Sequence, residues 1–324
     1  MLRTSWKAGV GLTVLATVSA GLLATPAEAA AKGVVSTMWG TRVVYKAAKG
    51  VQNKVVLSTK GLTTIVDDVV AIKAGKGCKA VKGDKTKVTC KLKHKPTTVL
   101  VYTYDRKDRI TNKTGSDMHA EGGSGPDTII GGPLGDGLYG GSGDDILYGR
   151  GGGDGLNGEA GQDTLYGEAG DDFLSGDSGT GKLYADVLSG GTGSDTASYS
   201  GYTKPITVDL DGAGRDDGAA GEHDTVRTDV ENIFGGRGAD RLTGNAAAND
   251  INGYFGDDVI RGGEGDDKLT GGDGVDQIYG EAGDDFLNGW SAPSALDLLD
   301  GGPNGSAGDW CYGEDTDRRT DCER

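Results

Sequence analysis

GGSGDDILY (Gly140–Tyr148) is a stretch that can form neither a helix nor an ordinary strand by itself. It holds three glycines, two adjacent aspartates and one aliphatic pair, which is too little apolar surface to bury one face of either element. The segments GRGGGDGLN (Gly149–Asn157), GEAGQDTLY (Gly158–Tyr166) and GEAGDDFLS (Gly167–Ser175) follow it without a gap. The period is nine residues, and a fixed period predicts a repeat architecture in which each unit depends on its neighbours.

Copies of this nonapeptide form two blocks in the chain. Position six is aspartate in every copy but one, where Asn249 stands, and position eight is always aliphatic. The seventh copy is lengthened by five residues and the last by three. An acid already stands two residues before an aliphatic residue in DRKDRIT (Asp105–Thr111), so the array can begin there as a cap. Full copies begin at Gly122, Gly131, Gly140, Gly149, Gly158, Gly167, Gly176 and Gly190, and again at Gly235, Gly244, Gly253, Gly262, Gly271, Gly280 and Gly289.

The pattern G-G-x-G-x-D-x-U-x, with U aliphatic, resembles the repeat of the RTX family of haemolysin-type calcium-binding proteins. The resemblance implies an all-β fold, a right-handed parallel β-roll (β-solenoid), that binds multiple Ca2+ ions. The chemistry agrees, because glycines let carbonyls turn inward and calcium accepts roughly six to eight oxygen ligands. The expected metal ligands are the position-six carboxylates Asp127, Asp136, Asp145, Asp154, Asp163, Asp172, Asp186, Asp195, Asp240, Asp258, Asp267, Asp276, Asp285 and Asp297.

Two nonapeptides make one complete coil, so aspartates eighteen residues apart are expected to stack on one side of the roll. Asp127, Asp145 and Asp163 then form one column, and the aspartates nine residues further on form the opposite column. Successive coils lie about 4.8 Å apart, a gap in which carboxylates of two coils can share an ion. The sites near Leu134, which replaces the position-four glycine, and near Asn249 are the ones we expect to be weak or empty.

Some copies carry a second acid at position five, for which two interpretations stay open. These side chains are either solvated charges or additional and outer-shell ligands. A rival interpretation of the whole array is a disordered linker rich in glycine and aspartate. A linker has no reason to keep an aliphatic residue at one phase, which favours the folded repeat. The position-five acids are Asp144, Asp171, Asp257, Asp266 and Asp284.

The charge is distributed unevenly along a chain whose net charge is −16. Residues 32–113 carry nineteen lysines and arginines against five acids, a net charge of +14. Residues 114–324 carry twelve against 43, a net charge of −31. A segment with that much negative charge resists a compact state unless a cation neutralises it.

The first 29 residues predict a secretory signal peptide. Arg3 and Lys7 give a basic start, Val10–Ala24 is apolar, and Ala27–Ala29 offers a small-x-small cleavage site. A membrane anchor is the alternative, but the apolar run of about fifteen residues is shorter than the roughly 20 that a bilayer span needs. We therefore predict an extracellular protein without a membrane span after cleavage. Members of the family exported in one step usually keep an uncleaved C-terminal signal instead, so this chain departs from that pattern.

β-branched runs separated by polar turns over residues 32–104 predict a small basic β domain. GGTGSDTASYSGYTKPITVDLDG (Gly190–Gly212), followed by Val230–Asn245, resembles the hinge between repeat blocks in this family, and the mature chain is similar to secreted actinobacterial members. The predicted organisation is a signal peptide (1–29), a basic N-terminal β domain (30–111), a first repeat block (112–198), an irregular hinge (199–234), a second repeat block (235–300) and a disulfide cap (301–324).

Four cysteines in an exported chain permit three disulfide pairings. The favoured pairing joins Cys78 to Cys90 and Cys311 to Cys322, because the repeat array separates the two pairs and a disulfide needs Cα atoms within about 7 Å. The spacings lack the C-x-x-C form of a zinc site.

The sequence predicts no enzyme. It has neither H-E-x-x-H nor G-x-S-x-G, and His94, His119 and His223 do not cluster. The predicted function is a secreted calcium-binding protein whose repeats fold on binding calcium, as a structural or adhesive module. The alternative is a small secreted enzyme with its site in the basic domain or the hinge and the repeats as a stabilising tail.

The basic domain leaves three interpretations open. It is a solvated lysine-rich face, or it docks on acidic repeats of the same or a neighbouring molecule, or it attaches to an anionic cell-wall polymer or acidic polysaccharide. Nucleic acid is disfavoured as a partner, because few aromatic residues interleave with the lysines.

Overall fold

The computed structural model describes residues 32–290, 295–303 and 308–323, which belong to one compact unit beginning at Lys32. The predicted signal peptide lies outside the described residues. Within the described ranges every regular secondary-structure element is a strand, which confirms the all-β class. None of the described segments is a helix long and apolar enough to cross a membrane.

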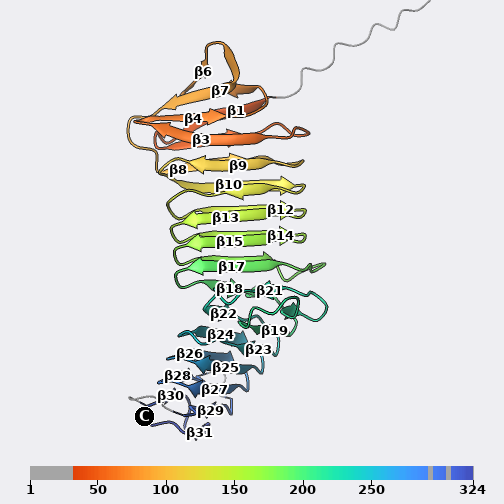
Figure 1. Cartoon of the computed structure of the whole chain (residues 1–324), viewed down its shortest axis with the longest axis vertical. Coiled ribbons are helices and arrows are strands. Elements are labelled where there is room, and N and C mark those ends of the chain that lie inside the picture. The colour runs from red at the N-terminus through yellow and green to blue at the C-terminus, as the bar shows by residue number, and fades with distance from the viewer. Residues whose placement is uncertain (1–31, 291–294, 304–307, 324) are drawn as a thin grey trace, which may run out of the picture. The chain divides into compact units, whose positions relative to one another are not determined.

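Strands stack one below another in three sheets (Figure 1). The long sheet has 14 strands and passes through both repeat blocks. In sheet order its strands are β5 (Ile72–Ala74), β1 (Gly33–Met38), β2 (Arg42–Lys46), β8 (Thr98–Tyr102), β10 (Asp117–Ser124), β12 (Gly137–Ser142), β14 (Gly155–Ala160), β16 (Phe173–Asp177), β18 (Thr196–Ser198), β22 (Asn232–Phe234), β24 (Asp250–Phe255), β26 (Lys268–Asp273), β28 (Phe286–Asn288) and β30 (Trp310–Tyr312).

Two shorter sheets alternate with the long sheet along the chain, so each coil gives one strand to each of two sheets. The N-terminal sheet consists of β6 (Cys78–Val81), β7 (Asp84–Lys91), β4 (Thr63–Asp67), β3 (Lys54–Lys60), β9 (Arg109–Lys113), β11 (Thr128–Ile130), β13 (Ile146–Gly151), β15 (Thr164–Ala169), β17 (Val187–Thr192) and β21 (Thr225–Val226). The C-terminal sheet consists of β20 (Gly218–Ala219), β19 (Ile206–Asp209), β23 (Arg241–Thr243), β25 (Val259–Glu264), β27 (Gln277–Ala282), β29 (Leu298–Asp300) and β31 (Arg318–Thr320).

The register of the parallel pairs follows the eighteen-residue coil. Leu138 of β12 lies opposite Leu156 of β14, which lies opposite Leu174 of β16. The aliphatic residues of position eight are buried and belong to one continuous core. The predicted parallel β-roll is therefore confirmed, and each repeat contributes one aliphatic side chain to its core.

The strands predicted for the basic domain continue the sheets of the roll. β2 pairs in parallel with β8, β8 with β10, and β3 with β9. Val101 of β8 lies opposite Ala120 of β10, and both belong to the same core as the repeats. Residue 111, at which we placed the domain boundary, lies within β9, and the division into domains stays a prediction.

The hinge changes the partner of the long sheet. The N-terminal sheet ends at β21 and the C-terminal sheet starts at β20, while the long sheet continues from β18 through β22 to β24. The buried rings of Tyr199 and Tyr202 meet edge to face with centroids 5.1 Å apart. Their hydroxyls donate to the buried carboxylates of Asp224 (3.1 Å) and Glu222. An aromatic cluster thus fills the core where the repeat is interrupted.

Both predicted disulfides are present. Cys78–Cys90 joins β6 to β7 with a Cα separation of 4.2 Å. Cys311–Cys322 ties β30 to the segment after β31 with a Cα separation of 5.7 Å. Each bond closes one end of the described unit.

Candidate metal centre and a basic edge

The position-six side chains stack as the eighteen-residue period predicts. The N–H of Asp127 donates to Oδ1 of Asp145 (2.6 Å), and the N–H of Asp145 donates to Oδ1 of Asp163 (2.7 Å). Every expected ligand is at most 5% exposed, and their role as ligands stays a prediction. The columns are Asp127, Asp145, Asp163 and Asp186; Asp136, Asp154, Asp172 and Asp195; Asp240, Asp258, Asp276 and Asp297; and Asn249, Asp267 and Asp285.

Most of these carboxylates have one oxygen without a hydrogen-bond partner, although it is buried. An unpaired polar atom of this kind costs about 1–3 kcal/mol, and more when it is charged. A bound cation is the partner that would remove this cost. The unpaired atoms are Oδ2 of Asp127, Asp145, Asp154, Asp163, Asp172, Asp186, Asp195, Asp258, Asp267, Asp276, Asp285 and Asp297.

Oxygen atoms surround the first glycine of the turn. A Cβ placed on Gly140 would overlap Oδ2 of Asp145 and would lie 2.8 Å from the carbonyl oxygen of Gly158 in the next coil. A carboxylate oxygen and a carbonyl oxygen of two different coils therefore meet at one place. Such an all-oxygen donor set fits a hard cation such as calcium.

Backbone angles decide which turns have this form. At position four, Gly143 has a φ of 124°, outside the left-handed region that other residues tolerate, so glycine is required. At position two, Glu159 has a φ of 74°, which lies near that region. We call a turn open when φ is positive at both positions and Oδ2 is unpaired. The described open turns begin at Gly122, Gly140, Gly149, Gly158, Gly167, Gly190, Gly253, Gly262 and Gly271.

Burial raises the pKa of the carboxyl groups in the open turns. The pKa of Asp145 rises to about 8, chiefly because burial penalises its charge, while the N–H of Asp127 stabilises the anion and opposes the rise. Burial likewise raises the pKa of Asp154 to about 7. A cation that binds here must therefore replace protons near neutral pH.

Among the repeats that the structure describes, three turns close on themselves instead. In each, the N–H of position two donates to the side-chain oxygen of position six that is unpaired elsewhere. None has a positive φ at position two or four. We call these self-closed turns. Their donor and acceptor residues are Gly132 and Asp136, Gly236 and Asp240, and Asn245 and Asn249.

Two self-closed turns contain the departures noted in the sequence, Leu134 and Asn249. The third, around Asp240, has an unbroken GGRGAD motif, and no sequence signal marks it.

The position-five acids bind the next coil. Each is exposed or half-buried, and its Oδ1 accepts a backbone N–H eighteen or more residues further on. These contacts give the side chains a role in stacking that neither of the two open interpretations included. The pairs are Asp144 with Gln162, Asp171 with Ser194, Asp257 with Val275, Asp266 with Asp284, and Asp284 with Gly308.

Two buried aspartates outside the expected set extend columns at their C-terminal ends. The N–H of Asp186 donates to Oδ1 of Asp224 (2.8 Å), and the N–H of Asp285 donates to Oδ1 of Asp309 (2.9 Å). Each stands two residues before a buried apolar residue, Val226 and Cys311 respectively. That spacing is the signal that could have identified them in the sequence.

The charges of residues 32–113 separate onto two edges of the coils. The acids lie at the edge where β4 ends and β7 begins, which we call the mixed-charge edge. There Lys87 forms ion pairs with Asp67 (2.9 Å) and Asp84 (3.3 Å). The acids of this segment are Asp67, Asp68, Asp84, Asp105 and Asp108.

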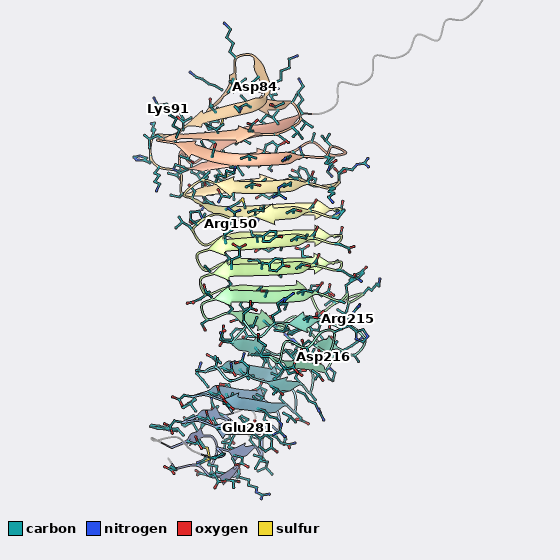
Figure 2. The ribbon with its side chains drawn as sticks, viewed as in Figure 1. Asp84, Lys91, Arg150, Arg215, Asp216 and Glu281 are labelled. Carbon is teal, nitrogen blue, oxygen red and sulfur yellow. A yellow bond between two sulfur atoms is a disulfide. The ribbon has the colours of Figure 1, made fainter. Side chains whose placement is uncertain are left out.

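The opposite edge lies where β3, β7 and β9 end, and we call it the basic edge. Of the charged residues in 32–113, only lysines and arginines lie there. Lys91 and Arg150 lie on this side in Figure 2, and Asp84 lies at the other end of β7. A hollow of about 520 Å3 lies between Lys113 and Arg150. In the part of the chain that the structure describes, none of its lysines forms an ion pair with a carboxylate. The residues of the basic edge are Arg42, Lys60, Lys91, Lys93, Lys95 and Lys113.

The three histidines are not brought together. His94 lies in the loop between β7 and β8, His119 lies on β10, and His223 lies in the hinge between β20 and β21. Carboxylates gather in the columns and, within the hinge, at Asp209, Asp211 and Asp216, and lysines gather along the basic edge.

The family model of the RTX calcium-binding nonapeptide repeat matches residues 121–156, 148–183, 180–198, 228–260 and 252–287. The matches cover parts of both repeat blocks and leave out residues 32–120, 199–227 and 288–324. Comparison with curated proteins gives no match.

Proposed function

Since the chain is an RTX-type calcium-binding repeat protein, we propose that it is secreted, that its repeats fold on binding calcium outside the cell, and that the folded roll is a structural or adhesive module without catalytic activity. The observation that carries this proposal is the line of buried, unpaired Oδ2 atoms in the open turns. Groups of this kind are stable inside a protein when they are paired or bind a metal.

Each open turn would hold an ion through residues of two coils. Asp145 would contribute Oδ2, and the carbonyl oxygens around Gly140 and Gly158 would complete the donor set. The bound ion supplies positive charge, which neutralises the column. The chain itself supplies the alignment, because the position-six N–H groups of Asp127 and Asp145, for example, are already bonded to Oδ1 of the next coil.

The small core makes folding depend on this charge neutralisation. One aliphatic side chain per repeat buries too little apolar surface to offset an ordering cost of about 1–2 kcal/mol per residue. An ion that binds only the folded form adds its binding free energy to that of folding. We therefore expect the calcium-free chain to be expanded.

A calcium titration of the full chain tests the proposal. Millimolar calcium should induce strand signal in circular dichroism and reduce the hydrodynamic radius. Magnesium at the same concentration should do much less, because it requires octahedral geometry and releases its water reluctantly. A calcium-free chain that is already compact and rich in strand would contradict calcium-dependent folding.

We also propose that the basic edge attaches the protein to an anionic cell-wall polymer or acidic polysaccharide. In support, none of the five acids of residues 32–113 lies at this edge, so its five lysines can act together. Trp39, which is 78% exposed and lies 4.9 Å from the guanidinium of Arg42, adds an exposed ring at the same edge.

A matched pair of variants tests the attachment. Changing Lys60, Lys91, Lys93 and Lys95 to glutamine should weaken binding to immobilised anionic polymer by at least about tenfold at low salt. The control removes the same charge from the mixed-charge edge and should change binding by less than about twofold. Equal losses in both variants would show attraction by net charge alone and would exclude a specific edge. The control residues are Lys46, Lys49, Lys54 and Lys107.

A further inference from the structure

The turn TYDRKD (Thr103–Asp108) between β8 and β9 has the form of an open turn without containing a glycine. It precedes the first repeat and lies outside the residues matched by the RTX repeat. Asp108 takes position six, and Ile110, which is 1% exposed, takes position eight opposite Ile129.

The backbone of this turn has the angles of an open turn. Tyr104 at position two has a φ of 73°, and Arg106 at position four has a φ of 84°. Positive φ is unfavourable for a residue with a Cβ, and position four is glycine in the open turns of the repeats. Something in the folded protein must offset this cost at two residues of one turn.

The carboxylate of Asp108 has the same bonds as those in the open turns. It is 2% exposed, its Oδ1 accepts the N–H of Asn53 (2.6 Å), and its own N–H donates to Oδ1 of Asp127 (2.7 Å). Its Oδ2 has no hydrogen-bond partner. The hydroxyl of Thr103 also lies near this carboxylate, and it donates to the carbonyl oxygen of Gly122 (3.0 Å).

The carbonyl groups are also in register with the array. A Cβ on Gly123 would overlap the carbonyl of Tyr104, as a Cβ on Gly141 would overlap the carbonyl of Gly123. A Cβ on Gly125 would overlap the carbonyl of Arg106 in the same way. The turn therefore presents its carbonyl oxygens to the coil below as a consensus turn does.

We propose that Thr103–Asp108 binds an additional calcium ion, shared with the turn that begins at Gly122. This inference rests on calcium binding by the repeats. The ion would join the basic N-terminal strands to the array, because Asp108 also holds the N–H of Asn53 at the start of β3. Calcium would then order residues of the N-terminal strands that carry no repeat motif.

Native mass spectrometry of the calcium-loaded full chain measures the number of ions directly. Asp108→Asn should bind one ion fewer than the wild type. Asp105→Asn is the control, because Asp105 lies in the same turn and its Oδ1 accepts the N–H of Gly50 (2.5 Å); its ion count should not change. Equal counts in Asp108→Asn and the wild type would overturn the extra site. A wild type that binds no calcium would instead contradict the proposed function.

A second variant keeps the test decisive if Asp108→Asn fails to fold. The double change Tyr104→Gly and Arg106→Gly removes the two unfavourable φ angles and keeps every main-chain oxygen. It should keep the ion count and lower the calcium midpoint of folding, because glycine adopts positive φ without strain. An unchanged or raised midpoint would overturn the proposal.

Discussion

Open and self-closed turns differ in where one side-chain oxygen finds its partner. In the open turn at Gly140, Oδ2 of Asp145 is unpaired, whereas in the self-closed turn at Gly131 the corresponding atom of Asp136 accepts the N–H of Gly132. The self-closed turns stand first in their columns. Oδ1 of Asp136 caps Met118 of β10, and Oδ1 of Asp240 caps Ile206 of the hinge. Neither of these N–H groups belongs to an aspartate turn.

This difference teaches that an ion site is a property of two stacked turns and not of one nonapeptide. Each of the nine open turns of the repeats follows another turn in its column. Three of the four columns begin with a self-closed turn, and the fourth begins with the open turn of Asp108. We expect calcium in the open turns and none in the self-closed ones.

The largest expected effect is a response of the calcium-free protein to pH. The folded-state pKa of Asp145 is raised from 3.8 to about 8, and that of Asp258 also to about 8. A carboxyl group with a raised folded pKa contributes stability that is fully present below its unfolded pKa and is lost as the pH rises through its folded value. Protons therefore replace calcium at acidic pH.

Without calcium, the chain should be more compact at about pH 5.5 than at about pH 8.5. Circular dichroism and hydrodynamic radius in the presence of a chelator measure this. With saturating calcium the two pH values should give the same folded signal. Equal expansion at both pH values without calcium would show that the buried carboxylates do not control folding.

The second effect separates the two kinds of turn directly. Asp145→Asn removes the unpaired oxygen's charge from an open turn, so the calcium midpoint should rise by about tenfold, which corresponds to about 1.4 kcal/mol. Asp136→Asn acts in a self-closed turn, and the number of bound ions should not change. Calcium titration with native mass spectrometry checks both variants. The loss of an ion in Asp136→Asn would mean that hydrogen bonding within the turn does not exclude calcium.

The sequence predicts the phase of the repeat well, because positions six and eight face the column and the core in every coil. It does not predict the self-closed turn at Asp240, whose GGRGAD motif is unbroken, since the coil above it comes from the irregular hinge. The sequence also does not predict the separation of charges between the mixed-charge edge and the basic edge. Lys91 and Asp84 are seven residues apart, and only the direction of β7 sends them to opposite edges.

The third effect compares position four in the two kinds of turn. Gly143 has a φ of 124°, and a Cβ there would lie 2.8 Å from the carbonyl oxygen of Gly125. Gly143→Ala should therefore destabilise the calcium-loaded protein by about 1–3 kcal/mol. Leu134 occupies position four of a self-closed turn and is 44% exposed, so Leu134→Ala should change stability by less than about 0.5 kcal/mol. Urea unfolding in excess calcium measures both, and similar losses would remove the distinction between the turns.

The smallest effect is expected at position five of an open turn. Asp144 is exposed, and its Oδ1 accepts the N–H of Gln162 at 3.0 Å. Asp144→Asn keeps an oxygen acceptor at this place and removes only a screened surface charge, so the calcium midpoint should move by less than about twofold. Asp144→Ala removes the acceptor and should loosen the contact between the two coils without losing an ion.

Comparing Asp144→Asn with Asp145→Asn isolates the geometry of the site, because the two changes remove the same charge from adjacent residues. Only the side chain of Asp145 faces the oxygen atoms around Gly140. If both substitutions raised the midpoint alike, calcium would respond to the total negative charge of the column. Amide hydrogen exchange of Gln162 adds an independent readout, since its N–H should lose protection in Asp144→Ala and keep it in Asp144→Asn.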